Sequence, residues 1–140
     1  MIVRDADFAA DFASIRLVRQ EVFIDEQRVP SDLEWDDRDA LCRHVLALDG
    51  DTPIGTGRLD LDYDGKVGRL AVRASHRRSG AGTLLMERLH ELARSAGLPL
   101  VWCHAQVIAA PFYERLGYVA TGEHFLEADI EHVRMVRPLR

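Results

Sequence analysis

The hydrophobic pattern of residues 67–96 changes its period once, across a short glycine-rich stretch. Val67–Arg73 follows the pattern of a buried strand bounded by turn residues. The period then becomes helical, with apolar side chains at Leu85, Leu89, Leu92 and Ala96. Gly97 and Pro99 provide a stop for that helix. The chain must therefore pass from a strand, through a flexible loop at residues 76–82, into an amphipathic helix.

The loop, HRRSGAG, combines positive charge with flexible residues at a helix start. Helix N-termini carry unpaired N–H groups and partial positive charge, and glycines let an anion approach them closely. The alternative is a solvated turn whose arginines face water. A P-loop requires Gly-Lys-Ser/Thr, but Gly82 is followed by Thr83 and Leu84. A dinucleotide fingerprint requires a third glycine near position 85, which is leucine. The sequence therefore predicts a phosphate site of another kind.

The first half of the chain predicts a strand, a helix and an antiparallel meander. Residues 1–4 are typical of a strand, and Asp5 or Asp7 can cap a helix that ends around residues 26–28. The apolar positions of this helix are Phe8, Phe12, Ile15 and Val22. Residues 31–40 are acidic and predict a loop with a short helical turn. Residues 45–48, 54–62 and 67–73 predict three strands joined by turns.

The second half alternates strands with helices. Residues 100–103 predict a short buried strand, and residues 109–116 a compact helix that ends at Gly117. Residues 118–125 and 132–136 predict two more strands. The alternation favours an α/β (α+β) fold with a partly parallel sheet covered by helices.

Composition narrows the class of protein. A chain of 140 residues with 47% apolar and 29% charged residues fits one globular domain, residues 1–140. The net charge of −5 gives no indication of nucleic-acid binding. Signal-like and membrane-spanning patterns are missing, which favours a cytoplasmic protein without a membrane partner. Cys42 and Cys103 are expected to be buried free thiols within strand-like runs, with a single disulfide as the alternative, and no Cys/His spacing predicts a metal site.

The glycine loop and four further segments together resemble a known family. The run Arg77-Arg78-Ser79-Gly80-Ala81-Gly82 resembles the Arg/Gln-x-x-Gly-x-Gly/Ala signature of the GNAT superfamily of acetyltransferases. Residues 106–118, QVIAAPFYERLGY, resemble the family's Asn-x-x-Ala-x-x-x-Tyr-x-x-x-Gly-Phe segment, with glutamine and tyrosine at its ends. VFIDEQRVP at 22–30, EWD at 34–36 and HAQ at 104–106 are similar to the ElaA-like branch. The resemblance spans nearly the whole chain.

The resemblance implies a mixed, mainly antiparallel sheet of six to seven strands flanked by about four helices. The fourth and fifth strands would splay apart, and coenzyme A would lie in the gap. The backbone of residues 70–72 would pair with the pantetheine arm and polarise the thioester carbonyl. The cofactor-binding residues implied are Leu70, Ala71, Val72, Arg77, Arg78, Ser79, Gly80, Ala81, Gly82, Thr83, Gln106, Ala109 and Phe112.

The activity implied is direct transfer of the acetyl group of acetyl-CoA to a primary amine of a small molecule or peptide, without a metal. Tyr113 matches the family's usual acid for the departing thiolate; the alternative is a packed tyrosine with a satisfied hydroxyl. The expected base is Glu26, and the alternatives are His104, Glu127, His132 or a chain of waters.

The acceptor is expected to be cationic. Seven acidic residues crowd residues 25–39 against two arginines, and carboxylates around Glu26 and Glu34 could attract an ammonium group. Solvated surface is the alternative for this run. A non-catalytic acyl-CoA-binding regulator and a nucleotide-phosphate binder are the alternative functions. Homodimers are common in the family, and one sequence leaves that state open.

Overall fold

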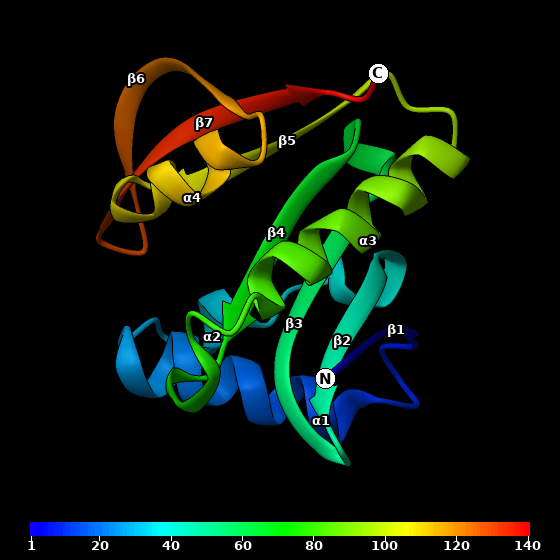
Figure 1. Cartoon of the computed structure of the whole chain (residues 1–140). Coiled ribbons are helices and arrows are strands. Elements are labelled where there is room, and N and C mark those ends of the chain that lie inside the picture. Colours follow the sequence, from blue (N-terminus) through cyan, green and yellow to red (C-terminus); the bar gives the residue numbers. More distant parts are fainter.

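The alternating apolar segments pair into one seven-stranded sheet (Figure 1). The computed structural model describes all 140 residues. The sheet order is β1-β2-β3-β4-β5-β7-β6, and every neighbouring pair is antiparallel except β4 and β5. The strands are β1 (Ile2–Ala6), β2 (Arg43–Asp49), β3 (Thr52–Asp60), β4 (Lys66–Val72), β5 (Leu100–Gln106), β6 (Val119–Glu127) and β7 (Ile130–Pro138). The predicted sheet type and strand number are confirmed.

Four α-helices flank the sheet, as predicted. They are α1 (Phe12–Arg19), α2 (Ser31–Glu34), α3 (Ala81–Ser95) and α4 (Ala110–Arg115). The predicted start of the first helix is wrong, because residues 8–11 form a turn in which Asp7 accepts the Ala10 N–H at 2.8 Å. Helix α1 continues as a π-helical segment, Gln20–Glu26, so its predicted end is confirmed. None of these helices is long and apolar enough to cross a membrane.

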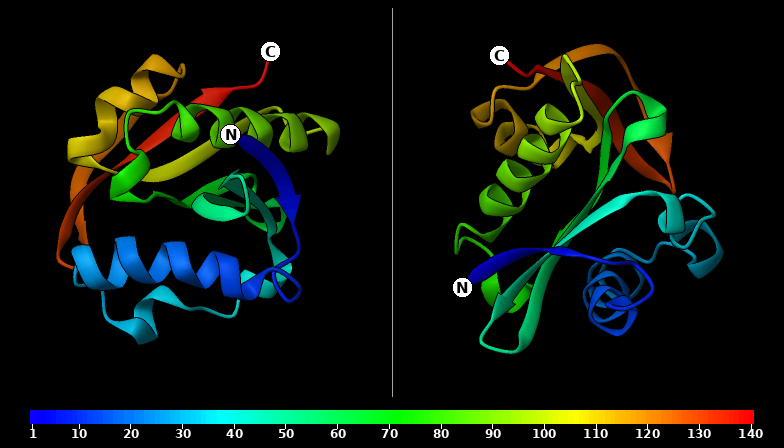
Figure 2. Two further views of the ribbon diagram at one scale, coloured as in Figure 1. Left: turned by 60° about the horizontal axis from the view of Figure 1, so that its bottom comes forward. Right: turned by 90° about the vertical axis from the view of Figure 1, so that its right-hand side faces the viewer.

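The helices cover both faces of the sheet (Figure 2). Helices α3 and α4 lie on one face, over the main core, which includes the helical stripe residues Leu85, Leu89 and Leu92. Helix α1 and its π-helical extension lie on the opposite face, where Val18 and Phe23 belong to a second apolar cluster. Both cysteines are free, as predicted, and Cys103 is buried in β5. The predicted burial of Cys42 is wrong, because this residue precedes β2 and is only partly buried.

Strands β4 and β5 run parallel but stay together only at one end. Their register contains the single pair Lys66–Trp102, next to which the Trp102 N–H donates to the Gly65 carbonyl at 3.2 Å. Beyond this point the strands diverge, and the edge of β4 that faces β5 has no strand partner. The splay between the fourth and fifth strands is therefore confirmed, and it opens the sheet at its centre.

A β-bulge in β4 adjusts the strand beside this opening. Gly68 pairs with Arg58 and Ala71 with Thr56, so two residues of β4, Arg69 and Leu70, face the single residue between. The bulge places Val67 and Leu70, three positions apart, on the same core face. Arg69 has a φ of 50°, in the left-handed region that side chains rarely adopt. The bulge turns the Arg69 side chain toward α2, where it donates to the Glu34 carbonyl at 3.0 Å.

Candidate functional site

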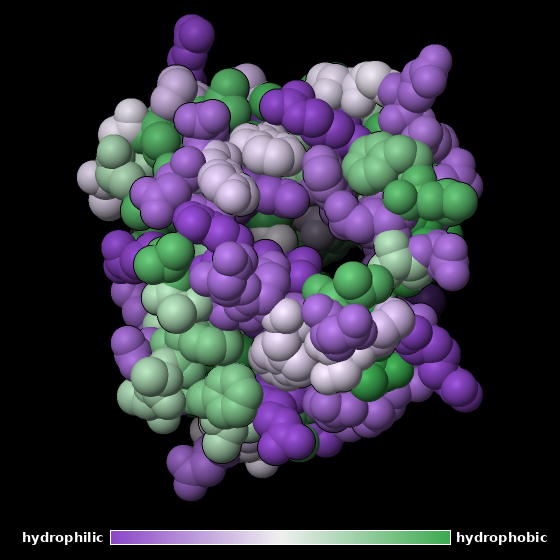
Figure 3. Space-filling model, turned by 180° about the vertical axis from the view of Figure 1, so that it is seen from behind, coloured by the Kyte–Doolittle hydropathy of each residue, from purple (hydrophilic) through white to green (hydrophobic).

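A cavity of about 910 Å³ occupies the opening between β4 and β5. Figure 3 shows a dark hollow in the face seen from behind, with hydrophilic residues around much of its rim. Residues of β4 and β5 line its sides, and the segment Val22–Val29, helix α4 and the β6–β7 turn contribute further walls. The volume lies within the usual range for small-molecule sites. The cavity therefore crosses the sheet at the break in its strand pairing.

The glycine loop lies beside this cavity and begins α3. Gly80 is the N-cap residue with a φ of 88°, a conformation that glycine adopts without strain. The Ala81 N–H donates to the Ser79 hydroxyl at 3.3 Å, but the N–H groups of Gly82 and Thr83 have no acceptor in the protein. Two free amides at the positive end of a 15-residue helix form a site suited to a phosphate oxygen.

Gly82 connects the loop to the cavity wall. A Cβ atom at this position would lie 3.3 Å from the Phe112 ring and 3.9 Å from Val72, and both residues line the cavity. The absence of a side chain therefore lets the start of α3 pack directly against Phe112. The space that the glycine leaves is filled by this ring.

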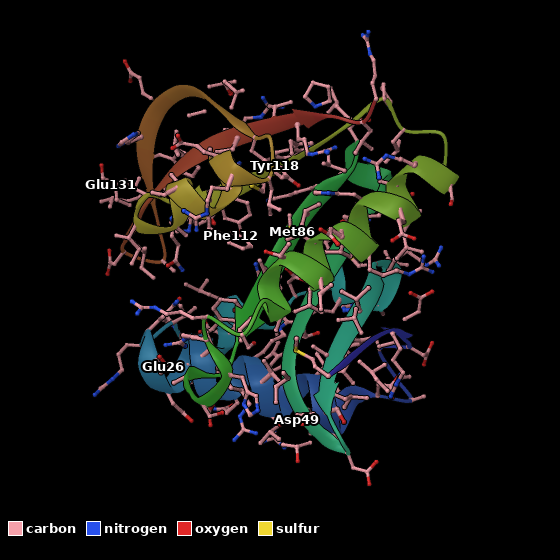
Figure 4. All side chains as sticks on the ribbon, in the orientation of Figure 1. Glu26, Asp49, Met86, Phe112, Tyr118 and Glu131 are labelled. Carbon is pink, nitrogen blue, oxygen red and sulfur yellow. The ribbon has the colours of Figure 1, made fainter.

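Arg77 and Glu26 form an ion pair at the same end of the cavity. The Arg77 Nη2 lies 2.7 Å from the Glu26 Oε1, and the Arg77 Nε donates to the Val72 carbonyl at 3.0 Å. Figure 4 shows Glu26 on the side of the opening away from Phe112. Arg77 is thereby held between β4 and the end of the first helix, with its guanidinium on the cavity lining.

Two tyrosines on or next to α4 differ in how their hydroxyl groups are paired. The Tyr118 hydroxyl is buried and lies 2.7 Å from His90 Nε2. Tyr113 lines the cavity, packs edge-on against the rings of Phe112 and Tyr118, and its hydroxyl has no hydrogen-bond partner. No fully buried polar side-chain atom lacks a partner, so the unpaired Tyr113 hydroxyl is not completely buried. Tyr113 is thus a free phenol inside the cavity.

Burial raises the pKa of Tyr113, so this phenol stays protonated at neutral pH. The buried thiol of Cys103 lines the same cavity, and burial raises its pKa to about 12. Burial in this part of the cavity therefore raises the pKa of both acidic side chains, Tyr113 and Cys103.

A carboxylate with two histidines lines the opposite region, on the β5 and β6–β7 side. The His104 Nδ1 lies 3.1 Å from the Glu127 Oε1, and the His132 Nε2 lies 3.7 Å from the Glu127 Oε2. Phe125 packs against both imidazole rings. No group of three or more His, Cys, Asp or Glu residues is arranged to hold a metal ion. The cluster therefore presents proton-accepting groups to the cavity.

Comparison with known proteins assigns the family. A family model described as Acetyltransferase (GNAT) domain matches residues 15–139. The protein named Uncharacterized N-acetyltransferase YjcF of Bacillus subtilis is 38% identical over 122 residues, which cover 86% of this chain and 87% of that protein. This chain belongs to the GNAT acetyltransferase family.

Solved structures show the same fold. Escherichia coli ElaA superposes on this GNAT chain with a TM-score of 0.87 and 24% identity, covering 98% of this chain and 99% of that one. An aminoglycoside 6'-N-acetyltransferase complexed with coenzyme A superposes with a TM-score of 0.75 and 17% identity, covering 100% and 98% of the two chains. The family model and the relative in Bacillus subtilis confirm the predicted superfamily, and these structures share its fold.

The structure of this GNAT protein brings most of the predicted cofactor residues to one cavity. The residues that line it are Leu70, Ala71, Val72, Arg77, Gln106, Ala109 and Phe112. The remaining residues form the adjacent loop and the first turn of α3: Arg78, Ser79, Gly80, Ala81, Gly82 and Thr83. Gln106 also donates to the Gln27 side chain at 2.8 Å, which connects the end of β5 to the first helical segment.

The expected wall of free carboxylates at residues 25–39 is wrong for Glu34, Asp36 and Asp39. Three arginines from distant parts of the chain neutralise them, and the buried Arg19 alone lies 2.7 Å from both Glu34 and Asp39. Burial raises the pKa of Glu34; for Asp36 the same effect is outweighed by the hydrogen-bonded Arg58, and its pKa is about 2. These carboxylates fix the segment to the sheet and do not face an acceptor freely.

Proposed function

We propose that this GNAT protein is an acetyl-CoA-dependent N-acetyltransferase that acts on a primary amine of a small molecule or peptide. The observation that carries the proposal is one cavity that combines two complementary groups. The unpaired amides of Gly82 and Thr83 lie beside one end, and the unpaired Tyr113 hydroxyl lies inside. The first group suits a pyrophosphate, and the second suits a leaving group that needs a proton.

The free edge of β4 would hold the extended part of coenzyme A. Leu70, Ala71 and Val72 line the cavity where β4 has no partner strand, so their exposed backbone groups can pair with amides of the pantetheine arm. Arg77 would add charge near the pyrophosphate, with Glu26 orienting its guanidinium. Acetyl-CoA supplies the activated acetyl group. The residues of the chain position the thioester, exclude water and move protons.

The amine attacks the thioester carbonyl carbon, and the C–S bond breaks when the resulting oxyanion collapses. Tyr113 would protonate the departing thiolate, because its hydroxyl is free, protonated and directed into the cavity. A general acid of this kind typically contributes about 10²–10⁴-fold to the rate. A non-catalytic acyl-CoA-binding regulator would have no use for an unpaired phenol at this position.

Two measurements test the proposal together. Calorimetry compares the affinity of the protein for acetyl-CoA and for ADP, and thiol release is followed with a panel of primary amines, each product being identified by mass spectrometry. We expect acetyl-CoA to bind more tightly than ADP and at least one amine to be acetylated. Binding of acetyl-CoA without turnover of any amine would favour the regulator. Equal affinity for ADP and acetyl-CoA would favour the nucleotide-phosphate binder.

A further inference from the structure

Glu127 differs from the other carboxylates that line the cavity. Five acidic residues line it, and four of them form ion pairs with arginine: Glu26, Glu34, Asp36 and Asp60. Glu127 has only the two histidines as partners, and 47% of its side chain is exposed. It is therefore the one carboxylate of the cavity whose charge no arginine neutralises. We propose that Glu127 and His132 together accept the proton of the acceptor's ammonium group.

The hydrogen bond that His132 makes through Nδ1 fixes the tautomer of its imidazole ring. Its Nδ1 lies 2.6 Å from the Ile130 carbonyl oxygen, which can only accept, so Nδ1 carries the hydrogen. In the neutral ring Nε2 then carries no hydrogen, and it lies 3.7 Å from the Glu127 Oε2. Two acceptors face each other without a hydrogen between them. An ammonium group can donate to both at ordinary hydrogen-bond distances.

His104 holds the carboxylate in this position. Its Nδ1 donates to Glu127 Oε1, which leaves Oε2 for the gap with His132. Phe125 packs edge-on against His104 and stacks on His132, so both rings are held by the same side chain. His104 acts here as a positioning residue, whereas Glu127 and His132 would contact the amine nitrogen.

The neighbouring charged groups have other contacts. Lys66 and Arg134 both stack over the ring of Trp102, and neither has a carboxylate partner. Glu131 pairs with His124 at 2.7 Å on the same hairpin, and neither residue lines the cavity. Among the cavity carboxylates, Glu127 beside His132 is therefore the one that we expect a cationic amine to approach. It replaces the acidic run at residues 25–39 as the expected source of attraction.

The proton balance of the proposed step is complete. The ammonium gives one proton to the Glu127–His132 pair, which releases it to solvent, and the neutral amine then attacks the thioester. The nitrogen loses a second proton as the amide forms. One proton equivalent passes to the thiolate through Tyr113, so the products are the N-acetyl amide, the free thiol and one proton.

The inference rests on the proposed function, and amine basicity provides its test. Glu127→Gln is assayed with an accepted alkyl amine and with its β,β,β-trifluoro analogue, at a pH well above the pKa of the trifluoro ammonium group, so that its nitrogen is already neutral. We expect kcat/KM for the basic amine to fall about 10²-fold or more. For the neutral analogue the fall should stay below about tenfold, since no proton must be removed before attack. The pH at which the variant reaches full activity with the basic amine should also rise.

Glu131→Gln is the matched control, because it removes a histidine-paired carboxylate from the same hairpin outside the cavity. This control should leave kcat/KM unchanged for both amines. Equal losses of kcat/KM for the two amines in Glu127→Gln would assign a structural role to Glu127 and overturn the inference. A selective loss of kcat/KM for the basic amine in Glu26→Gln, without one in Glu127→Gln, would also overturn it. An inactive wild type with every amine would instead overturn the proposed function.

Histidine nitrogen NMR gives a second readout that needs no turnover. The ¹⁵N shifts of His132, identified by comparison with His132→Gln, should show hydrogen on Nδ1 and a bare Nε2 in the neutral ring. A neutral His132 with its hydrogen on Nε2 would overturn the inference, because that hydrogen would already fill the gap to Glu127.

Discussion

Replacement of Tyr113 by phenylalanine removes one hydroxyl group that has no partner in the protein. Because no hydrogen bond is lost and the ring contacts with Phe112 and Tyr118 remain, we expect the free energy of unfolding to change by less than about 0.5 kcal/mol. The effect should fall on catalysis, where the thiolate would leave without a proton donor.

The expected magnitude is that of a typical general acid in a cavity that keeps it protonated. Burial raises the pKa of Tyr113, and burial likewise raises the pKa of the neighbouring Cys103 thiol to about 12. A poorly solvated site disfavours the charge of a departing thiolate, so we expect its protonation by Tyr113 to assist the reaction. Loss of a general acid should lower kcat about 10²–10⁴-fold. That range corresponds to about 2.7–5.4 kcal/mol in the activation free energy.

Tyr118→Phe is the matched control on the neighbouring ring. Its hydroxyl is buried at 2.7 Å from His90, so its removal leaves the histidine unpaired and should destabilise the fold by about 1–3 kcal/mol. Its kcat should stay within a few-fold of the wild-type value. We therefore expect opposite results for the two substitutions: Tyr113→Phe lowers kcat, whereas Tyr118→Phe lowers the free energy of unfolding.

The assay is thiol release under saturating acetyl-CoA and amine, with rapid-quench measurement of a single turnover to establish that chemistry limits the rate. Acetyl-CoA affinity is measured by calorimetry for both variants, and stability by urea unfolding. A Tyr113→Phe enzyme with near-normal single-turnover rate would refute the reasoning and reduce Tyr113 to a packing residue.

Three further substitutions test the structure elsewhere. Gly82→Val should weaken acetyl-CoA binding at least about tenfold in calorimetry, because its side chain would push the Phe112 ring, 3.3 Å from the Cβ position, into the cavity; an unchanged Kd would remove this loop from the binding site. Arg19→Leu should lower the free energy of unfolding by about 3–5 kcal/mol, because it leaves two buried carboxylates without their shared partner; a loss below 1 kcal/mol in urea unfolding would contradict this. Burial lowers the pKa of His90 to about 4 from an ordinary value near 6.5, so the stability it contributes is present above pH 6.5 and is lost as pH falls toward 4. Between these pH values the wild type should lose about 3 kcal/mol more than His90→Gln, and equal losses would show that the histidine does not titrate in this way.

The sequence by itself determined the features that depend on neighbouring residues. The strand at residues 67–73, the glycine loop and the helical stripe that starts at Leu85 were all predicted from local periodicity and turn chemistry. The free amides at the start of α3 follow from the same local pattern, since every helix N-terminus leaves such groups unpaired. The predicted start of the first helix failed because a turn held by Asp7 competes with helix at residues 8–11.

Only the tertiary structure decided which charged and hydroxyl groups remain free. Glu34 looked available in the sequence, but the fold brings Arg19 and Arg69 against it from 15 and 35 residues away. Tyr113 and Tyr118 are the same residue type and lie five residues apart. The fold pairs the Tyr118 hydroxyl with His90 and leaves the Tyr113 hydroxyl without a partner. The reason is that an ion pair or a buried hydrogen bond depends on distances across the folded chain. Local sequence therefore fixes backbone conformation, whereas tertiary packing decides which side chains are left unpaired for chemistry.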